Sequence, residues 1–207
     1  MTRLTHLRQA VLVSGLALLS GCAAISAVGD AATPLDVYEL RAPDSIQPAN
    51  RAAARDVIVE QPTTSGALET DRIMIRPDPL QAQYLPEVRW SEPTPVMVQT
   101  LMLRSIEATG AVRYVGRTPL GASGDIALVT EIIDFQAEVN PDGDTATVEV
   151  RLLVRMVRER DAQILASRTF SASTPSASTE TEVLIDAFSA ASDRVFVDLA
   201  AWVRDLI

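Results

Sequence analysis

Three consecutive segments in the second half of the chain alternate apolar and polar residues, and this pattern most constrains the fold. They cover residues 125–139, 145–157 and 163–173, and short turn sequences separate them. Alternation with a period of two is typical of strands that bury one face. Because short turns join neighbouring antiparallel strands, the three segments predict an antiparallel meander.

The first of these strands contains an irregularity in its pattern. Large apolar residues occupy even positions as far as Ile132 and odd positions from Ile133 to Val139. A regular strand would point the two sets to opposite faces, whereas one extra residue would return both sets to the same face. We therefore predict a β-bulge or bend near Ile132–Ile133.

A long amphipathic helix is expected after the strands. Apolar residues recur there at steps of three and four, the spacing of one helix face: Leu184, Phe188, Ala191, Val195, Leu199, Trp202 and Leu206. Thr179 and Glu182 have the spacing of a capping box, which predicts the start of this helix. At 1.5 Å per residue it would be about 40 Å long and would cross a whole sheet.

The first half of the chain predicts one more helix and several shorter strands. Thr94 is expected to be its N-cap, with Pro95 at the first helical position, and Gly110 is expected to end it. Strands are expected at residues 35–41, 57–59, 72–76 and 112–115, with an extended segment at 80–90. The fold class expected is α/β: a single-domain sandwich of a mostly antiparallel sheet with two main helices on one face, the C-terminal one long.

The N-terminal residues have the pattern of an exported bacterial lipoprotein. A short polar start precedes an apolar run of about ten residues, which is about half the length of a membrane-spanning helix. The sequence Leu19-Ser20-Gly21-Cys22 follows and resembles the lipobox of bacterial lipoproteins. The resemblance implies cleavage between Gly21 and Cys22 and acylation of Cys22, with palmitate as one expected acyl chain. The alternative is an ordinary exported protein with an incidental cysteine.

These signals divide the chain into three parts. Residues 1–21 are expected to be a signal peptide, residues 22–34 an acylated tether and residues 35–207 the folded domain. Two or more acyl chains anchor a protein stably without crossing the membrane. Ala23, and not Asp, follows the cysteine, which by analogy with bacterial lipoproteins favours the outer membrane, with the domain facing the periplasm.

Composition excludes several classes of function. The only His is His6 and the only Cys is Cys22, so the mature chain lacks the residues for Ser–His–Asp or Cys–His catalysis, for His/Cys metal or haem sites and for an internal disulfide. Without residues 1–21 the chain has 16 basic and 27 acidic residues, a net charge of −11. Such a charge disfavours nucleic acid as a partner. No metal and no cofactor is expected.

A calcium loop and a hairpin turn compete for the segment between the first two long strands. Asn140, Asp142 and Asp144 resemble the start of an EF-hand loop. That loop requires Gly after the third ligand and Glu at its twelfth position, whereas Thr145 and Arg151 stand there. The hairpin turn is therefore favoured.

Two charged clusters lie on the long strands. The acidic one comprises Glu131, Asp134 and Glu138. Paired carboxylates could perform glycoside chemistry, but a solvated strand face is favoured. The basic one comprises Arg151, Arg155, Arg158 and Arg160. It would bind an acidic lipid headgroup or, as favoured, pair with carboxylates on neighbouring strands. No residue is nominated as catalytic.

Several segments together resemble a known family. They are Asp71–Pro77, Gln83–Pro95 and Gln99–Leu101, with Tyr38-Glu39-Leu40 ahead of Pro43 and the strand Leu128–Glu138. These resemble the auxiliary lipoproteins of ABC-type transport systems, which are the lipoprotein partners of mammalian-cell-entry (MCE) lipid transporters and include the lipoprotein of the paraquat-inducible system.

The resemblance implies a non-enzymatic docking or coupling subunit. Its partners would be an MCE-domain protein, a permease and an ATPase, which move phospholipids or other hydrophobic molecules. A direct lipid-binding shuttle and a carboxylate-based periplasmic hydrolase are the alternatives, and a homo-oligomer stays open. Because aromatic residues with polar tips suit interfaces, Tyr84, Leu85 and Trp90 in Tyr84–Pro95 are the expected partner contacts. Alternatively, Tyr84 and Trp90 cover the sheet edge and the core.

Overall fold

Three long antiparallel strands form the centre of the protein in the computed structural model, which describes residues 34–207. They are β7 (Ile126–Val139), β8 (Ala146–Arg158) and β9 (Gln163–Ser176), in the order of the chain. The meander predicted from the alternating pattern is confirmed. The expected signal peptide, the cleavage site and Cys22 lie outside the described residues.

Shorter strands complete a mixed sheet along the other edge of β7. The first part of that edge pairs in parallel with β2 (Ala53–Val59), which continues to β6 (Val112–Gly116). The last part pairs in parallel with β3 (Met74–Asp78), which continues to β4 (Gln81–Tyr84). The strands β1 (Asp36–Tyr38) and β5 (Val88–Trp90) form a separate parallel pair.

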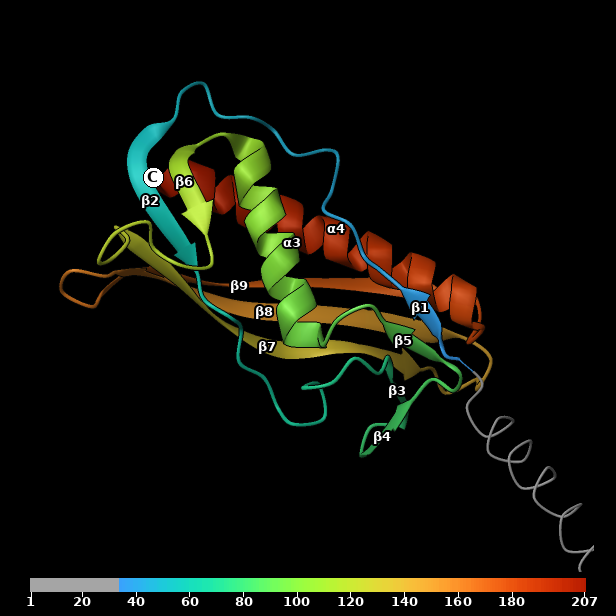
Figure 1. Ribbon diagram of the computed structural model, residues 1–207. Helices are drawn as coiled ribbons and strands as arrows, with labels where there is room; N and C mark the ends of the chain where they lie inside the picture. The colour runs from blue at the N-terminus through green and yellow to red at the C-terminus, as the bar shows by residue number, and fades with distance from the viewer. Residues whose placement is uncertain (1–33) are drawn as a thin grey trace, which may run out of the picture. The chain divides into compact units, whose positions relative to one another are not determined.

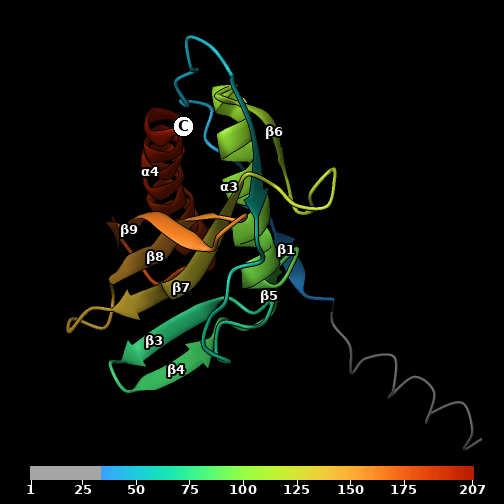
Figure 2. The ribbon, with the colours of Figure 1, turned by 90° about the vertical axis from the view of Figure 1, so that its left-hand side faces the viewer.

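Both helices lie on the same face of the long strands, as Figures 1 and 2 show. The first, α3 (Thr94–Thr109), packs against β2, β6 and the second helix, α4 (Thr181–Leu206), which covers β8 and β9. This arrangement confirms the expected α/β fold with two helices and a mostly antiparallel sheet. In the part of the chain described here, no helix is both long enough and apolar enough to cross a membrane.

The predicted bulge in β7 is confirmed at Ile133. Ile132 pairs with Leu152 and Asp134 pairs with Arg151, so Ile133 has no partner on β8. Its side chain is 42% exposed, whereas that of Ile132 is 2% exposed. The extra residue lets apolar side chains before and after it face the helices, because it restores the alternation that the sequence interrupts.

The helix starts differ from the prediction. Pro93 is the N-cap of α3, and Thr94 lies inside the helix with its hydroxyl donating a hydrogen bond to the carbonyl of Thr70 at 3.2 Å. Glu180 precedes α4 without a side-chain cap. The capping box at Thr179 is therefore wrong, because the helix begins at Thr181. Gly110 ends α3 in the left-handed region at φ 58°, as predicted, since Gly adopts this conformation without strain.

Candidate functional site

Two of the three predicted partner contacts are core residues. The side chain of Trp90 is 1% exposed and that of Leu85 is 5% exposed. Side chains so deeply buried in their own chain offer no surface to a partner, and the prediction is corrected for both. Tyr84 is 39% exposed, and its hydroxyl donates a hydrogen bond to the carbonyl of Ala67 at 2.9 Å.

Trp90 belongs to an aromatic cluster that joins the sheet to the C-terminal helix. Its ring lies edge-on to Phe188 of α4, with centroids 5.4 Å apart, and to Phe135 of β7, at 6.2 Å. Phe135 and Phe188 are stacked at 5.6 Å. Such pairs add to the stabilisation that burial of their area provides. The alternative role, in which Trp90 covers the core, fits this geometry.

The segments that carry the family resemblance hold one another in place. Arg89 forms an ion pair with Asp71 at 3.2 Å, and the Trp90 amide donates to the Asp71 carbonyl at 2.7 Å. The Arg72 guanidinium donates to the Leu85 carbonyl at 3.0 Å. These bonds fasten the segment before β3 to the segment around β5. The motif therefore has a structural role in placing Trp90 beneath the helices.

Two carboxylates of the acidic cluster on the long strands bind guanidinium or amide groups of neighbouring side chains. The bulge brings Glu131 and Asp134 to the same face, but Asp134 pairs with Arg151 at 3.0 Å. The amide nitrogen of Gln136 donates to Asp134 at 3.0 Å and to Glu138 at 3.3 Å. Asp134 and Glu138 therefore accept hydrogen bonds from side chains of the same sheet.

The basic cluster divides among neighbouring carboxylates. Arg151 pairs with Asp134 across two strands, as favoured. Arg158 and Arg160 instead reach Asp161 in the turn between β8 and β9, at 3.1 and 3.8 Å. Within residues 34–207, Arg155 is the member of the cluster that makes no ion pair. The four residues therefore do not form one anion-binding surface.

The segment between β7 and β8 is the predicted hairpin turn. Asp142 accepts hydrogen bonds from the Thr145 hydroxyl at 2.7 Å and from the Thr145 and Asp144 amides at 3.0 and 3.1 Å. The Thr145 hydroxyl contributes most to lowering the pKa of Asp142. Gly143 adopts a φ of 78°. Across residues 34–207, no three His, Cys, Asp or Glu side chains gather to hold a metal ion.

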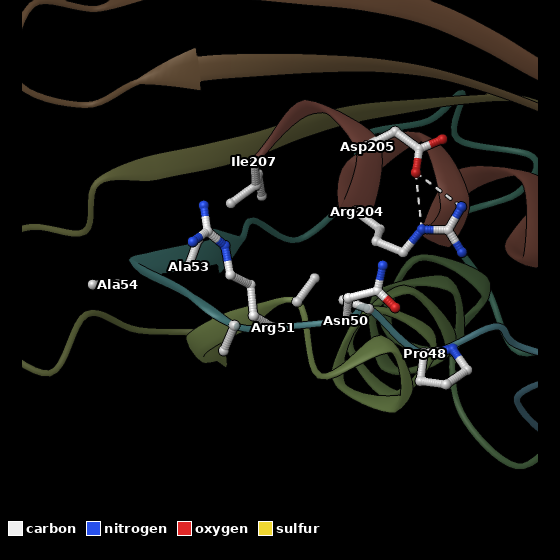
Figure 3. Close-up of a pocket in the computed structure, with 11 residues that line it drawn as sticks. Pro48, Asn50, Arg51, Ala53, Ala54, Arg204, Asp205 and Ile207 are labelled. Carbon is white, nitrogen blue, oxygen red and sulfur yellow. Dashed lines mark hydrogen bonds and ion pairs between the residues drawn. The ribbon is translucent and has the colours of Figure 1, made fainter.

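A pocket lies where the end of α4 meets the segment before β2, and Figure 3 shows its lining. Its volume is about 740 Å³, and its charged residues are Arg51, Arg204 and Asp205. Arg204 donates to Asp205 at 2.8 Å and to the Gln47 carbonyl at 3.2 Å. The one acidic side chain in the lining, that of Asp205, is thus paired with Arg204.

A second surface lies between β9 and α4 and was missed by the sequence interpretation. A groove of about 510 Å³ is lined by Ser171–Ser173 on the strand side, by Asp193, Arg194, Val197 and Asp198 on the helix side, and by Ser45. Burial, followed by repulsion from Asp44, raises the pKa of Asp193. The strand side consists of small residues, which carry no signal of a binding surface in the sequence.

The family model of the ABC-type transport auxiliary lipoprotein component matches residues 38–200. The chain belongs to this family. The matched range includes all of the strands from β2 onward and most of α4. The family's description is that of lipoprotein components that assist ABC-type transport, and a lipoprotein family suggests the cell envelope.

Individual relatives agree with the family fold. An uncharacterized protein of Bradyrhizobium diazoefficiens is 28% identical over 168 residues, which make up 80% of this chain and 44% of that protein. This chain thus spans less than half of that relative's length. A Xanthomonas campestris crystal structure, described under the family model DUF330, has a TM-score of 0.72 and 23% identity over 82% of this chain and 95% of its own.

A further crystal structure, of an uncharacterized protein, has a TM-score of 0.59 and 15% identity over 84% of this chain and 98% of its own. At these identities the two crystal structures show a shared fold. The arrangement of two helices on a mixed sheet is thus found in other proteins of very different sequence.

Proposed function

We propose that this auxiliary lipoprotein is a non-catalytic docking subunit of an MCE-type transport system for phospholipids or other hydrophobic molecules. The observation that carries the proposal is the family match, which extends over residues 38–200. The site geometry supports it, because the carboxylate of Asp134 and that of Asp205 are engaged by guanidinium groups of the same chain. The partners would be an MCE-domain protein and, through it, a permease and an ATPase.

We further propose that acylated Cys22 anchors the protein to the outer membrane, with the folded domain in the periplasm. The support is the lipobox-like sequence Leu19-Ser20-Gly21-Cys22 and the Ala that follows it. The tether up to Pro34 would be at most about 45 Å long at roughly 3.5 Å per residue. The domain would then work close to the membrane that holds it.

The test is purification of the full-length acylated protein from cross-linked membranes in mild detergent, followed by mass spectrometry of bound proteins and lipids. We expect an MCE-domain protein in the eluate and a mass on Cys22 that corresponds to diacylglycerol and a fatty acyl chain. A Cys22→Ala variant, which cannot be acylated at this position, controls for anchoring and should leave the membrane fraction.

Two outcomes would contradict the proposal. Co-purified lipid without a protein partner would support a lipid shuttle instead of a docking subunit. Absence of an MCE-domain protein from intact, cross-linked membranes, together with Cys22→Ala that stays in the membrane, would remove both the transport partner and the anchor.

A further inference from the structure

The strand β9 has a free edge. Among the described strands it pairs with β8 alone, and Figure 2 shows it at the border of the sheet with α4 above. An edge strand presents a row of unpaired backbone donors and acceptors, and proteins usually protect such rows with charges, prolines or short length. This strand is 14 residues long, and Arg168 is its one charged residue.

The register identifies which backbone groups face the free edge. The Asn140 amide donates to the Thr145 carbonyl at 2.9 Å, so the odd residues of β8 bond to β7 and the even ones bond to β9. Even residues of β9 are opposite even residues of β8 from Ala166 to Ser176. The amides and carbonyls that point away from the sheet therefore belong to Ser167, Thr169 and Ser171.

One end of the free edge is already closed. The Arg194 guanidinium donates to the Ser173 carbonyl at 3.1 Å and to the Thr174 hydroxyl. This bond agrees with the register, because Ser173 belongs to the outward-facing set. The next outward residue is Pro175, which has no amide hydrogen to offer. The unpaired stretch thus runs from Ser167 to Ser171 and ends where α4 reaches over the strand.

The helix beside this edge presents negative charge. Asp193 and Asp198 line the groove together with Val197 and Arg194. Arg194 is engaged by Ser173 and Thr174, and neither carboxylate has an ion-pair partner among residues 34–207. The charge of Asp44 also repels that of Asp193. A cation placed in the groove would relieve this repulsion, because opposite charges at close range stabilise each other.

We propose that the groove between β9 and α4 binds an extended, basic segment of a partner protein by β-strand addition. The segment's backbone would pair with Ser171, which lines the groove, and with Thr169 and Ser167 farther along the same edge, while alternate side chains would face the helix. Addition of a strand to a sheet edge obtains affinity from the backbone and specificity from every second side chain. A basic side chain meets Asp193 and Asp198, and an apolar one meets Val197. The inference does not depend on which transport system the protein serves.

The experiment measures binding of three fluorescent peptides to the full-length acylated protein in detergent micelles. The probe alternates Val and Arg; one control replaces every Arg with Glu, and the other carries N-methyl groups on alternate amides. We expect the probe to bind at least about tenfold more tightly than either control, because the first lacks the charge and the second the backbone donors. Equal binding of all three peptides would overturn the proposal.

Substitutions in the groove test whether the peptide binds there. The double change Asp193→Asn and Asp198→Asn should weaken binding of the probe about tenfold or more. The control is Asp186→Asn, which neutralises one carboxylate at an exposed position of α4 outside the groove and should leave binding unaltered. An equal loss in both variants, or no loss in the double variant, would contradict the proposed site.

Amide hydrogen exchange can be measured on the unaltered protein, so misfolding of a variant cannot affect the result. Binding of the probe should slow exchange of the Ser167, Thr169 and Ser171 amides, because each would donate to the added strand. Protection elsewhere without protection of these amides would overturn the proposal. So would protection of these amides that rises with protein concentration in the absence of peptide, since a second copy of the chain would then occupy the edge.

Discussion

The segment Tyr84–Pro95 and the groove between β9 and α4 differ in what the sequence suggests and in what the structure exposes. The first contains Tyr and Trp, which are enriched at interfaces, yet Leu85 and Trp90 are buried within the chain. The second is lined on one side by Ser171–Ser173, which suggests nothing in the sequence, yet it borders unpaired backbone. Aromatic residues thus mark area that must be buried, and tertiary contacts decide what buries it.

The strongest test of this comparison removes the aromatic ring at the centre of the first region. Trp90→Ala should lower the free energy of unfolding by about 3–5 kcal/mol, because it leaves a cavity beside Phe135 and Phe188. Urea denaturation measures the change. A variant of normal stability that nevertheless loses its partner would reverse the comparison and return Trp90 to an interface.

The bulge allows the same contrast within two adjacent residues. Ile132→Ala should cost about 2–4 kcal/mol, because this side chain is buried under the helices, whereas Ile133→Ala should change stability by less than about 0.5 kcal/mol. Chemical denaturation of the two variants side by side is the measurement. Equal costs would mean that the register of β7 differs from the one described.

Tyr84 tests whether any part of the first region acts at the surface. Tyr84→Phe removes the hydroxyl that bonds to the Ala67 carbonyl and should lower stability by about 0.5–1.5 kcal/mol. Thermal unfolding and partner capture from cross-linked membranes are measured on the same preparation. Reduced capture at unchanged stability would show a contact surface around Tyr84, while the reverse result would assign the hydroxyl to the fold.

The smallest expected effect concerns the pH dependence of the groove. Burial and the neighbouring Asp44 raise the pKa of Asp193, so the folded protein binds this proton more tightly than the unfolded chain does. The associated stability is present below the ordinary pKa of Asp and is lost as pH rises through the raised pKa. Asp193→Asn should therefore raise Tm slightly at pH 7 and leave it unaltered near pH 3.

Calorimetry at the two pH values checks this prediction, with Asp186→Asn as the control for loss of one charge from α4. A lower Tm for Asp193→Asn at pH 7 would mean that the Asp193 carboxylate has a stabilising partner in the folded protein. The acidic wall of the groove would then be satisfied within the chain, and the groove would differ less from the buried segment than we describe.

Periodic patterns predicted the elements but not their ends. The alternation in residues 125–173 and the stripe from Leu184 to Leu206 led to the meander, its bulge and the long helix, because side-chain direction repeats with a fixed period along each element. The caps at Thr94 and Thr179 were wrong. Whether a threonine caps a helix depends on which hydrogen-bond partner its hydroxyl finds in space. The Thr94 hydroxyl donates to the Thr70 carbonyl, which is distant in the sequence.

The candidate site was less predictable than the fold. The sequence favoured pairing of the arginines with carboxylates on neighbouring strands, and Arg151 does pair with Asp134. Arg158 and Arg160 instead bind Asp161 in the nearby turn. The groove could not be predicted from the sequence, because it combines the edge of β9 with one side of α4, which begins after that strand ends. Neither Ser171 nor Asp193 carries a pattern that indicates the other.

By itself, the sequence determined the local periodicities, the bulge at Ile133, the left-handed helix end at Gly110 and the resemblance to the auxiliary lipoproteins. These features depend on neighbours within a few residues or on short motifs that can be recognised in the sequence itself. Only the tertiary structure decided that Trp90 joins Phe135 and Phe188 in the core and that β9 keeps a free edge beside acidic residues of α4. Burial and pairing are properties of surfaces brought together from distant parts of the chain, and no single segment contains both surfaces.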